Sequence, residues 1–452
     1  MVFSNLFFIY LFLPLNLILY FISSNKTWRN GVLLAFSLFF YAWGEPVYIL
    51  IMFLSIGIDY THGMLVEKYK RRGNDRGARW AVASSVIFNL ALLFFFKYWD
   101  FIAANLSLIP GIDLPQLGIP LPIGISFYTF QALGYTIDVY RGDTCAEKNF
   151  FQYALFVSFF PQLVAGPIER SSRLLKQLST PHDFDYRRAR DGLLIMLLGF
   201  FEKVVIADRA AIYVNAVFGD WLNASGAQIA LATAVFAIQD LCDFAGYSYI
   251  AIGTAKVLGV ELMTNFRQPY FAHSVTNFWA RWHISLSSWF RDYIYFPLGA
   301  GRKGPARKAL NVMIVYTVSG LWHGGAPQFL AWGLLHGAGQ VVQDFYKKAK
   351  QAVFGEGKIG LEKLRHMLSV LLTFFTVMCF WIFFRSESVS MAVICLKNMF
   401  TRWNGFLYWR QFLFTMGLEK TQFFVAIAGI AVLFGIDLIS EKKKQEPAVW
   451  IY

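Results

Sequence analysis

The stretch Ser319-Gly320-Leu321-Trp322-His323-Gly324-Gly325 closes an apolar run that begins at Val312, and Pro327 follows it. Two glycines and a proline must interrupt a helix, and such a break is tolerated at membrane depth only where it is buried in protein or lines a cavity. An ionisable side chain in hydrocarbon is expensive, so His323 is a functional-site candidate. The stretch therefore predicts a helical membrane protein with an interior site at His323.

The composition supports an integral membrane protein. Apolar residues make up 57% of the 452 residues and charged residues only 15%, and the mean hydropathy is +0.46. A soluble domain carries about 25% charged residues. The net charge of +13 comes from Lys and Arg clustered between apolar runs, and no nucleic-acid-binding motif accompanies them. We therefore expect no nucleic-acid partner, and the four cysteines show no metal-ligand spacing.

The apolar runs predict an all-α integral membrane fold with about eleven transmembrane helices, because a span needs about 20 mostly apolar residues. We expect a single domain over residues 1–452, without internal repeats, in which the first run is kept as a span. The predicted spans are Phe3–Ile22, Gly31–Trp43, Val47–Val66, Trp80–Phe96, Pro122–Tyr140, Gly192–Phe218, Ile229–Val257, Val312–Leu321 with its continuation, Phe329–Phe345, Met367–Phe384 and Phe423–Ile439.

The charges of the connecting loops predict the orientation. Lys68–Arg79 holds six Lys or Arg against one acid, Arg302–Lys308 holds four and no acid, and Lys347–Arg365 holds six. Asp100–Leu121 holds none. Because basic loops stay in the cytoplasm, this pattern places the N-terminus outside and the tail with Lys442-Lys443-Lys444 inside.

Two segments are predicted to be helical without crossing the membrane. Asn149–Gly166 is apolar but has basic segments on both sides, so we interpret it as a re-entrant or half-buried hairpin. Thr276–Tyr293 carries too many charges for a span. Its aromatic residues share one helical face, so we expect an interfacial amphipathic helix capped by Ser274.

Histidine is suited to take and return a proton near neutral pH. His323 is a candidate catalytic base, and the alternative is a structural histidine bonded to a neighbouring carbonyl. His283 is a candidate partner base or carbonyl donor, or else an interfacial histidine facing water. His336 lies beyond the helix break, and we expect it to tie two helices together.

Two further features allow a functional or a structural reading. Asp240 and Asp243 interrupt an apolar stretch, where they would relay protons, bind an acceptor hydroxyl or pair with a nearby Arg. The loop Gly299–Gly304, with Arg302 and Lys303, is too short for a P-loop. Its N–H groups and cations could hold the phosphates of a nucleotide-containing donor, or it is only a positive-inside loop.

The chain resembles the membrane-bound O-acyltransferase (MBOAT) family. More narrowly, it is similar to the bacterial branch that contains the membrane component of alginate O-acetylation, its peptidoglycan and cellulose relatives, and the D-alanyl-teichoic-acid acyltransferase. Several long motifs in one order carry the resemblance: Met1–Tyr20, Leu121–Tyr128, Tyr135–Asp143, Phe159–Ile168, Asp243–Ser248, Asn265–Tyr270, Phe278–Gly301 and Leu321–Gly324. The sequence after about Lys347 is generic.

The resemblance implies a fold of many helices around a central funnel or tunnel. The family's signature histidine falls on His323, and its second characteristic polar position falls on His283. Members of this branch pass an acetyl group outward from the cytoplasm, usually with a separate extracytoplasmic acetyltransferase. Two departures from the family pattern, Ala245 for Ser and Tyr249 for Asp, weaken a relay role for this stretch.

These observations lead to one functional expectation. We expect an O-acyltransferase of the bacterial plasma membrane that moves acetyl from cytoplasmic acetyl-CoA toward a polysaccharide hydroxyl or a partner SGNH-type acetyltransferase, without a permanently bound cofactor. The alternatives are D-alanyl transfer from a carrier protein to teichoic acid, a proton-coupled transporter and a membrane scaffold. The expected site comprises His323 and His283 as catalytic residues, Arg302, Lys303, Arg281 and Trp282 at the donor, and Trp322, Gly324, Asp243, Ser287 and Arg291 along the tunnel.

The orientation is testable by labelling single cysteines from outside sealed cells, in a cysteine-free background. We expect cysteines placed in Lys68–Arg79 or Arg302–Lys308 to stay unlabelled, because these basic loops face the cytoplasm. A cysteine in Asp100–Leu121 should react. Labelling within Arg302–Lys308 would refute the predicted orientation.

Overall fold

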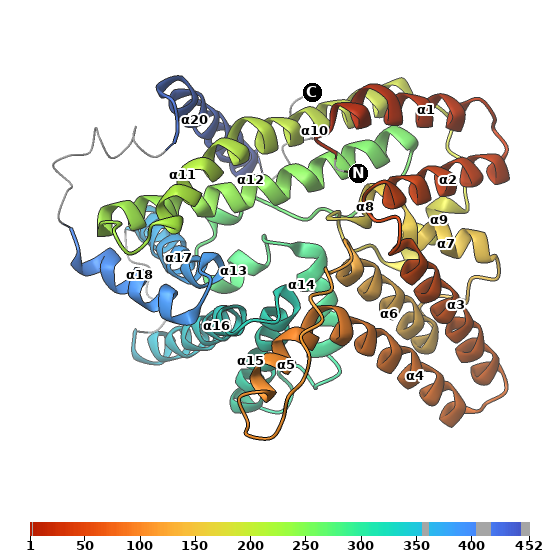
Figure 1. The fold of residues 1–452 in the computed structure, drawn as a ribbon, viewed down its shortest axis with the longest axis horizontal. Coiled ribbons are helices and arrows are strands. Elements are labelled where there is room, and N and C mark those ends of the chain that lie inside the picture. The colour runs from red at the N-terminus through yellow and green to blue at the C-terminus, as the bar shows by residue number, and fades with distance from the viewer. Residues whose placement is uncertain (2, 355–360, 404–416, 444–452) are drawn as a thin grey trace. The chain divides into compact units, whose positions relative to one another are not determined.

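The computed structural model describes residues 1, 3–354, 361–403 and 417–443 (Figure 1). Every regular element in these residues is a helix, which confirms the all-α prediction. The chain forms two compact units, which are described separately: unit 1 is Met1–Gly199 with Tyr247–Thr264, and unit 2 is Phe200–Gly246 with Asn265–Tyr452. Of the basic segments, Lys358 and Lys444 lie outside the described residues.

Unit 1 is a bundle of helices, three of which begin at asparagine caps. Asn25, Asn74 and Asn149 each accept hydrogen bonds from backbone N–H groups of the following helical turn. These bonds satisfy donors that have no partner inside a helix. Its helices are α1 (Leu13–Phe21), α2 (Lys26–Gly44), α3 (Ile49–Arg71), α4 (Asp75–Leu93), α5 (Trp99–Leu106), α6 (Ile125–Arg141), α7 (Phe150–Ser158), α8 (Phe160–Leu163), α9 (Ser171–Leu178) and α10 (Tyr186–Phe200), and α12 (Gly226–Leu258) ends in it.

A buried polar network joins α3 to α4 in unit 1. The carboxylate of Asp59 accepts from the Ser85 hydroxyl at 2.6 Å and from the Asn89 amide at 2.9 and 3.0 Å. All three side chains are buried. Leaving a neutral polar group unpaired in an apolar interior costs roughly 2–7 kcal/mol, and an unpaired charge costs more. Because only one arrangement of α3 and α4 pairs all three side chains, this network fixes how the two helices pack.

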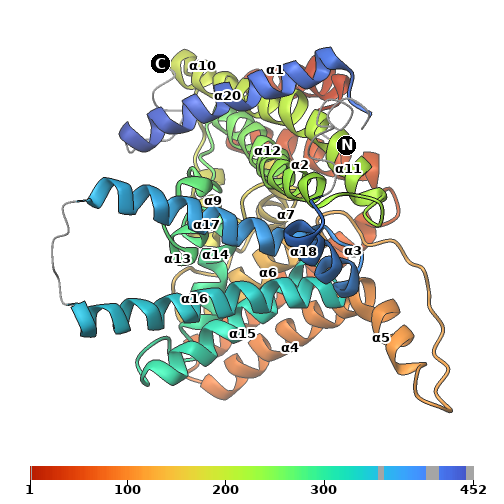
Figure 2. The same cartoon turned by 90° about the vertical axis from the view of Figure 1, so that its left-hand side faces the viewer.

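Unit 2 centres on an antiparallel pair of long helices, α15 (Pro305–His323) and α16 (Pro327–Phe354), which lie side by side in Figure 2. The two backbones meet at glycines. A Cβ on Gly320 would lie 2.4 Å from the Phe329 carbonyl oxygen, and one on Gly333 would lie 2.3 Å from that of Tyr316. The other helices are α11 (Asp208–Gly219), α13 (Val275–Trp279), α14 (Ile284–Phe290), α17 (Glu362–Arg385), α18 (Val389–Thr401) and α20 (Lys420–Lys443).

The predicted spans fall on helices, and five of the described helical segments are long and apolar enough to cross a membrane by length and composition. Others, such as α6 with 17 residues, are shorter. Short π-helical segments at Phe94–Tyr98 and Phe201–Ala207 join neighbouring helices into longer runs. The five segments are Ile49–Arg71, Asp75–Leu106, Gly226–Leu258, Glu362–Arg385 and Lys420–Lys443.

The prediction of one continuous helix over Thr276–Tyr293 is wrong. Helix α13 ends at Trp279 and α14 begins at Ile284, and His283 between them has a left-handed backbone with φ of 44°. The Ser274 cap is confirmed, because its hydroxyl accepts from the Asn277 N–H at 3.0 Å. The aromatic pattern correctly indicated helical structure. It could not indicate the turn at Ala280–His283, because this turn contains no glycine or proline.

Helices α7 and α8 match the expected re-entrant segment. They contain nine and four residues, so α7 extends only about 14 Å at 1.5 Å per residue. Most of their side chains are buried. A helix of this length cannot cross a bilayer of about 30 Å.

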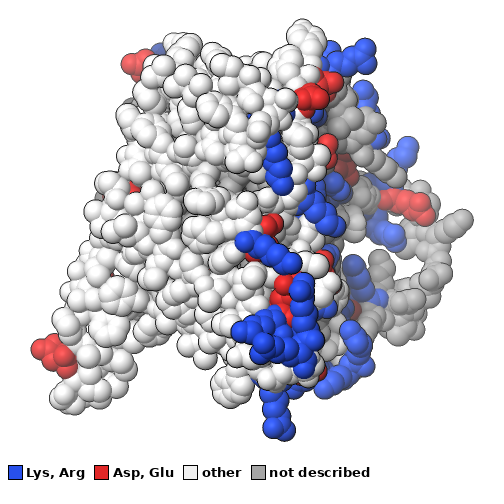
Figure 3. Space-filling view, turned by 90° about the vertical axis from the view of Figure 1, so that its right-hand side faces the viewer, with Lys and Arg blue, Asp and Glu red and all other residues white. Residues whose placement is uncertain are grey.

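Basic side chains gather at particular helix ends. Figure 3 shows Lys and Arg along one edge of the face it presents, while most of that face carries no charge. In unit 1, the turn from α3 to α4 holds Lys68, Lys70 and Arg71 at one end of the helical run Asp75–Leu106. The loop after Leu106 at the other end of this run has no Lys or Arg up to Leu121, as a positive-inside orientation requires.

The Asp59 network predicts a difference between two substitutions. Asp59→Ala should lower the free energy of unfolding by about 1–3 kcal/mol, because it leaves buried Ser85 and Asn89 donors unpaired. Asp59→Asn should cost less, since its amide keeps an acceptor oxygen. The measurement is the thermal midpoint of the purified protein in detergent. Lys70→Gln, at the exposed pair with Asp75, is the control; equal midpoints for Asp59→Ala and this control would contradict the prediction.

Candidate active site

The predicted helix break follows His323, which is the last residue of α15. Gly324 leaves the helix in extended conformation, and α16 begins at Pro327. The His323 ring is partly exposed and is surrounded by aromatic edges: ring centroids of Trp322 and Trp332 lie 4.8 Å away and that of Phe384 lies 5.2 Å away. The imidazole is thus held in an apolar enclosure that remains reachable.

His283 is held by Asn265. Its Nδ1 lies 3.1 Å from the Asn265 amide oxygen, which also accepts from the Ser285 hydroxyl at 2.8 Å and from the Ser285 backbone N–H at 3.3 Å. Since a backbone N–H can only donate, the Asn265 oxygen is correctly oriented, and Nδ1 of His283 must carry the hydrogen. Nε2 then bears the lone pair and accepts.

Burial lowers the pKa of His283 to about 3, so the imidazole is neutral at every physiological pH. A neutral ring with hydrogen on Nδ1 cannot donate from Nε2. His283 is therefore better suited to accept a hydrogen bond than to stabilise an oxyanion. Together, the hydrogen bond and the low pKa disfavour both the carbonyl-donor role and the partner-base role, and they fit a positioning role for His283.

His336 has the tying role that the sequence suggests. It is fully buried on α16, and its Nδ1 accepts from the indole N–H of Trp279 on α13 at 3.1 Å. Its ring packs on Trp332 at 4.9 Å between centroids. Its Nε2 has no hydrogen-bond partner among the described residues.

An unbroken series of ring contacts joins the three histidines in unit 2. His283 contacts Trp322 at 5.9 Å between centroids, and Trp322 contacts His323. Trp332 lies against both His323 and His336. The fold thus brings together the two predicted catalytic residues, although 40 positions separate them in the chain.

The loop Gly299–Gly304 is rigidly attached to the start of α15. The buried Asn311 amide donates to the carbonyls of Leu298 at 3.2 Å and Ala300 at 2.8 Å. Gly299, Ala300 and Gly304 have positive φ values of 94°, 51° and 91°. The side chains of Arg302 and Lys303 are exposed.

The loop and His323 lie at opposite ends of α15. The helix has 19 residues, which corresponds to about 28 Å at 1.5 Å per residue. The structure therefore does not bring Arg302 and Lys303 close to His323. A donor held by its phosphates at the loop would have to extend along the protein to reach His323.

The other two predicted donor contacts are occupied by protein partners. Arg281 forms a two-pronged ion pair with Glu441 of α20 at 2.6 and 2.9 Å and donates to the Gln268 carbonyl at 3.3 Å. Trp282 is buried between Phe266, Phe278 and Trp381. Their contact with a donor stays a prediction.

The predicted support residues are distributed over unit 2. Asp243 pairs with Lys203 at 2.6 Å, which matches the simple ion-pair alternative with Lys in place of Arg. Ser287 donates to the Trp282 carbonyl at 3.3 Å, and Arg291 pairs with Asp292 on an exposed surface. Trp322 and Gly324 adjoin His323 directly.

Sequence reasoning missed three residues that shape the site. Asn265 fixes His283, Trp332 packs against His323, and Glu441 holds Arg281. Asn265 was visible as part of the motif Asn265–Tyr270, but no spacing rule connects it to His283. Nothing in the sequence around Glu441 indicates its partner.

Comparisons with known proteins identify the family of the chain. Residues 145–356 match the model of the MBOAT, membrane-bound O-acyltransferase, family. A probable alginate O-acetylase of Pseudomonas syringae is 35% identical over 98% of this chain and 84% of its own length. A peptidoglycan O-acetyltransferase of Helicobacter pylori is 33% identical over 88% of this chain and 80% of its own length. A teichoic acid D-alanyltransferase of Bacillus subtilis is 26% identical over 63% of this chain and 73% of its own length.

Proposed function

Because the chain belongs to the membrane-bound O-acyltransferase family and is an O-acyltransferase, we propose that it moves acetyl from cytoplasmic acetyl-CoA toward an extracytoplasmic polysaccharide hydroxyl. The observation that carries this proposal is His323, a reachable imidazole enclosed by aromatic rings at a helix break. The alginate and peptidoglycan relatives support an acetyl group and a glycan acceptor. We place the protein in the bacterial plasma membrane, with its N-terminus outside.

In the proposed reaction His323 is the general base. It takes the proton of the acceptor hydroxyl while the oxygen attacks the thioester carbonyl. The tetrahedral intermediate then collapses, the C–S bond breaks, and His323 returns the proton to the leaving thiolate. The acceptor oxygen belongs either to the sugar or to a serine of a partner SGNH-type acetyltransferase.

The developing oxyanion needs hydrogen-bond donors close to His323. The N–H of Gly324 already donates to the Gly320 carbonyl at 3.4 Å. The indole N–H of Trp332 is buried without a hydrogen-bond partner among the described residues, and its ring adjoins His323. Trp332 is therefore a better candidate donor than His283, whose Nδ1 hydrogen is directed to Asn265.

D-alanyl transfer to teichoic acid is the second candidate. The teichoic acid relatives share the family fold but align over 63% and 58% of this chain, compared with 88% or more for the acetylating relatives. The wider alignment favours acetyl. A proton-coupled transporter is disfavoured, because Asp243 is neutralised by Lys203 and the family is enzymatic.

His323→Ala should reduce acetyl transfer by about 100- to 10,000-fold, the usual effect of removing a positioned base. His323→Gln should be nearly as inactive, because an amide keeps a hydrogen bond but cannot accept the proton. The measurement is release of labelled acetyl from acetyl-CoA by purified variants in detergent. Variants must match the parent protein in expression and thermal midpoint.

Asn265→Ala provides the matched comparison, since it perturbs His283 without touching His323. We expect a smaller loss of rate from it than from either His323 substitution. If His323→Ala retains most of its activity, or fails only because it unfolds, the assignment of the base is wrong and His323 is a structural residue.

Changing Arg302 and Lys303 together to Ala should raise the apparent KM for acetyl-CoA more than it lowers kcat. The physical reason is that a contact to the donor phosphates is made equally in the ground state and the transition state. Steady-state kinetics with varied acetyl-CoA measure both constants. An unchanged KM would leave the loop Gly299–Gly304 with a topological role alone.

A further inference from the structure

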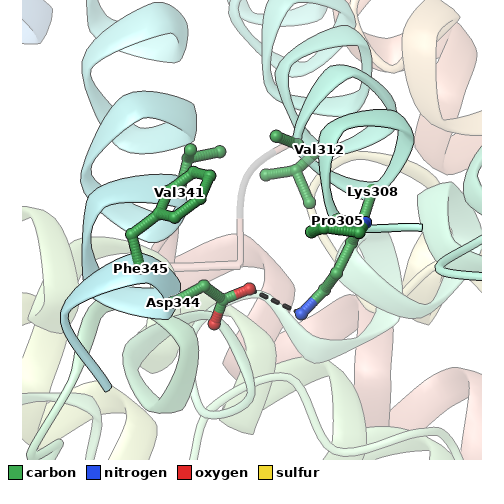
Figure 4. A pocket seen from close by; sticks show the side chains of 7 residues that line it. Pro305, Lys308, Val312, Val341, Asp344 and Phe345 are labelled. Carbon is green, nitrogen blue, oxygen red and sulfur yellow. Dashed lines mark hydrogen bonds and ion pairs between the residues drawn. The ribbon is translucent and has the colours of Figure 1, made fainter. Parts of the chain in front are cut away.

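A groove lies between α15 and α16 at the end of the helix pair farthest from His323 (Figure 4). It is shallow and open, and the space of about 310 Å³ between its lining side chains includes open solvent. The side chains of Val312, Val341 and Phe345 converge on it, and Lys308 and Asp344 reach toward each other across it. Its residues are Pro305, Lys308, Ala309, Val312, Val341, Asp344 and Phe345.

The groove has an apolar body with all of its charge at one end. Five of its seven residues have hydrocarbon side chains, and Lys308 and Asp344 form a 2.5 Å ion pair. Large apolar side chains beside it are exposed: Val342 by 66% and Phe345 by 54%. In a membrane protein, exposed apolar side chains of this kind face lipid chains.

The segment that leads into the groove at Lys308 is strongly basic. Arg302, Lys303, Arg307 and Lys308 lie within seven residues without an acid. The first three of these cations form no ion pair within the described part of the chain. Basic pockets between helices at the cytoplasmic surface attract anionic lipid headgroups, and each Lys or Arg there contributes a favourable term.

From this combination we infer that the groove binds one anionic phospholipid of the cytoplasmic leaflet, with an acyl chain along Ala309, Val312 and Val341 and the headgroup phosphate at Lys308. A nucleotide fits the groove poorly, since apart from Lys308 and Asp344 no polar side chain lines it to pair with a base or ribose. In this arrangement the phosphate competes with the Asp344 carboxylate for the Lys308 ammonium.

Binding there has a consequence for the helix pair itself. The lipid contacts α15 and α16 together, and the glycine contact of Gly320 with α16 lies farther along the same pair. A ligand that binds the folded pair stabilises it by mass action. Anionic lipid should therefore raise the thermal stability of the element that carries His323.

The test is the thermal midpoint of the purified full chain in a neutral detergent during titration with phosphatidylglycerol. The parent protein should gain stability with phosphatidylglycerol and much less with phosphatidylcholine. Lys308→Gln should weaken the apparent affinity about fivefold, the effect of one basic residue near an anionic membrane surface. Asp344→Asn should strengthen it, because the competing carboxylate is gone.

Two further variants and a soluble phosphate control distinguish lipid binding from binding of free phosphate and from a nonspecific effect of charge. Ala309→Phe fills the groove without changing its charge, so this variant should lose the thermal stabilisation by phosphatidylglycerol. Lys397 is an exposed lysine of α18 outside the groove. The control variant Lys397→Gln should keep the full stabilisation by phosphatidylglycerol. Equal effects of the two lipids, full stabilisation by glycerol 1-phosphate alone, or an unaltered response of Ala309→Phe would each overturn the inference. These readouts do not depend on acyl transfer, so either proposal can fail without the other.

Discussion

The close approach of α15 and α16 at Gly320 and Gly333 is the constraint on which the site depends. Backbone-to-backbone contact at these glycines leaves no space for a side chain, so α15 and α16 pack closely next to the turn that follows His323. Trp332, one position before Gly333, is thereby placed against the histidine. Tight helix contact through small residues is a common solution in membranes, where the hydrophobic effect does not drive helices together.

The sequence predicted the elements of the site better than their mutual geometry. The helix break at His323 follows from Gly324, Gly325 and Pro327, because glycine weakens a helix and proline is favoured at the first position of a new one. The turn at His283 could not be foreseen. His283 adopts a positive φ without being glycine, and the bonds from Asn265 to His283 and Ser285 that stabilise it connect residues 18 and 20 positions apart.

Long-range pairing was equally hidden for the charged residues. The sequence suggested a donor contact for Arg281, whose nearest carboxylate belongs to Glu441, 160 positions later. It also predicted a cationic loop at Gly299–Gly304, and the loop exists, but the 19-residue α15 places it far from His323. Local patterns define helices and loops, whereas distances between them come from tertiary packing.

The ion pair between Arg281 and Glu441 gives the last described helix, α20, a structural role at the turn before α14. Sequence after about Lys347 carries no recognisable motif, yet α20 anchors the turn that presents His283 through a bidentate contact. One carboxylate near the end of α20 therefore holds a turn that is 160 positions away in the chain. A shortened or tagged chain that disturbs this end would alter the turn at Ala280–His283 from a distance, so fusion partners are better attached elsewhere.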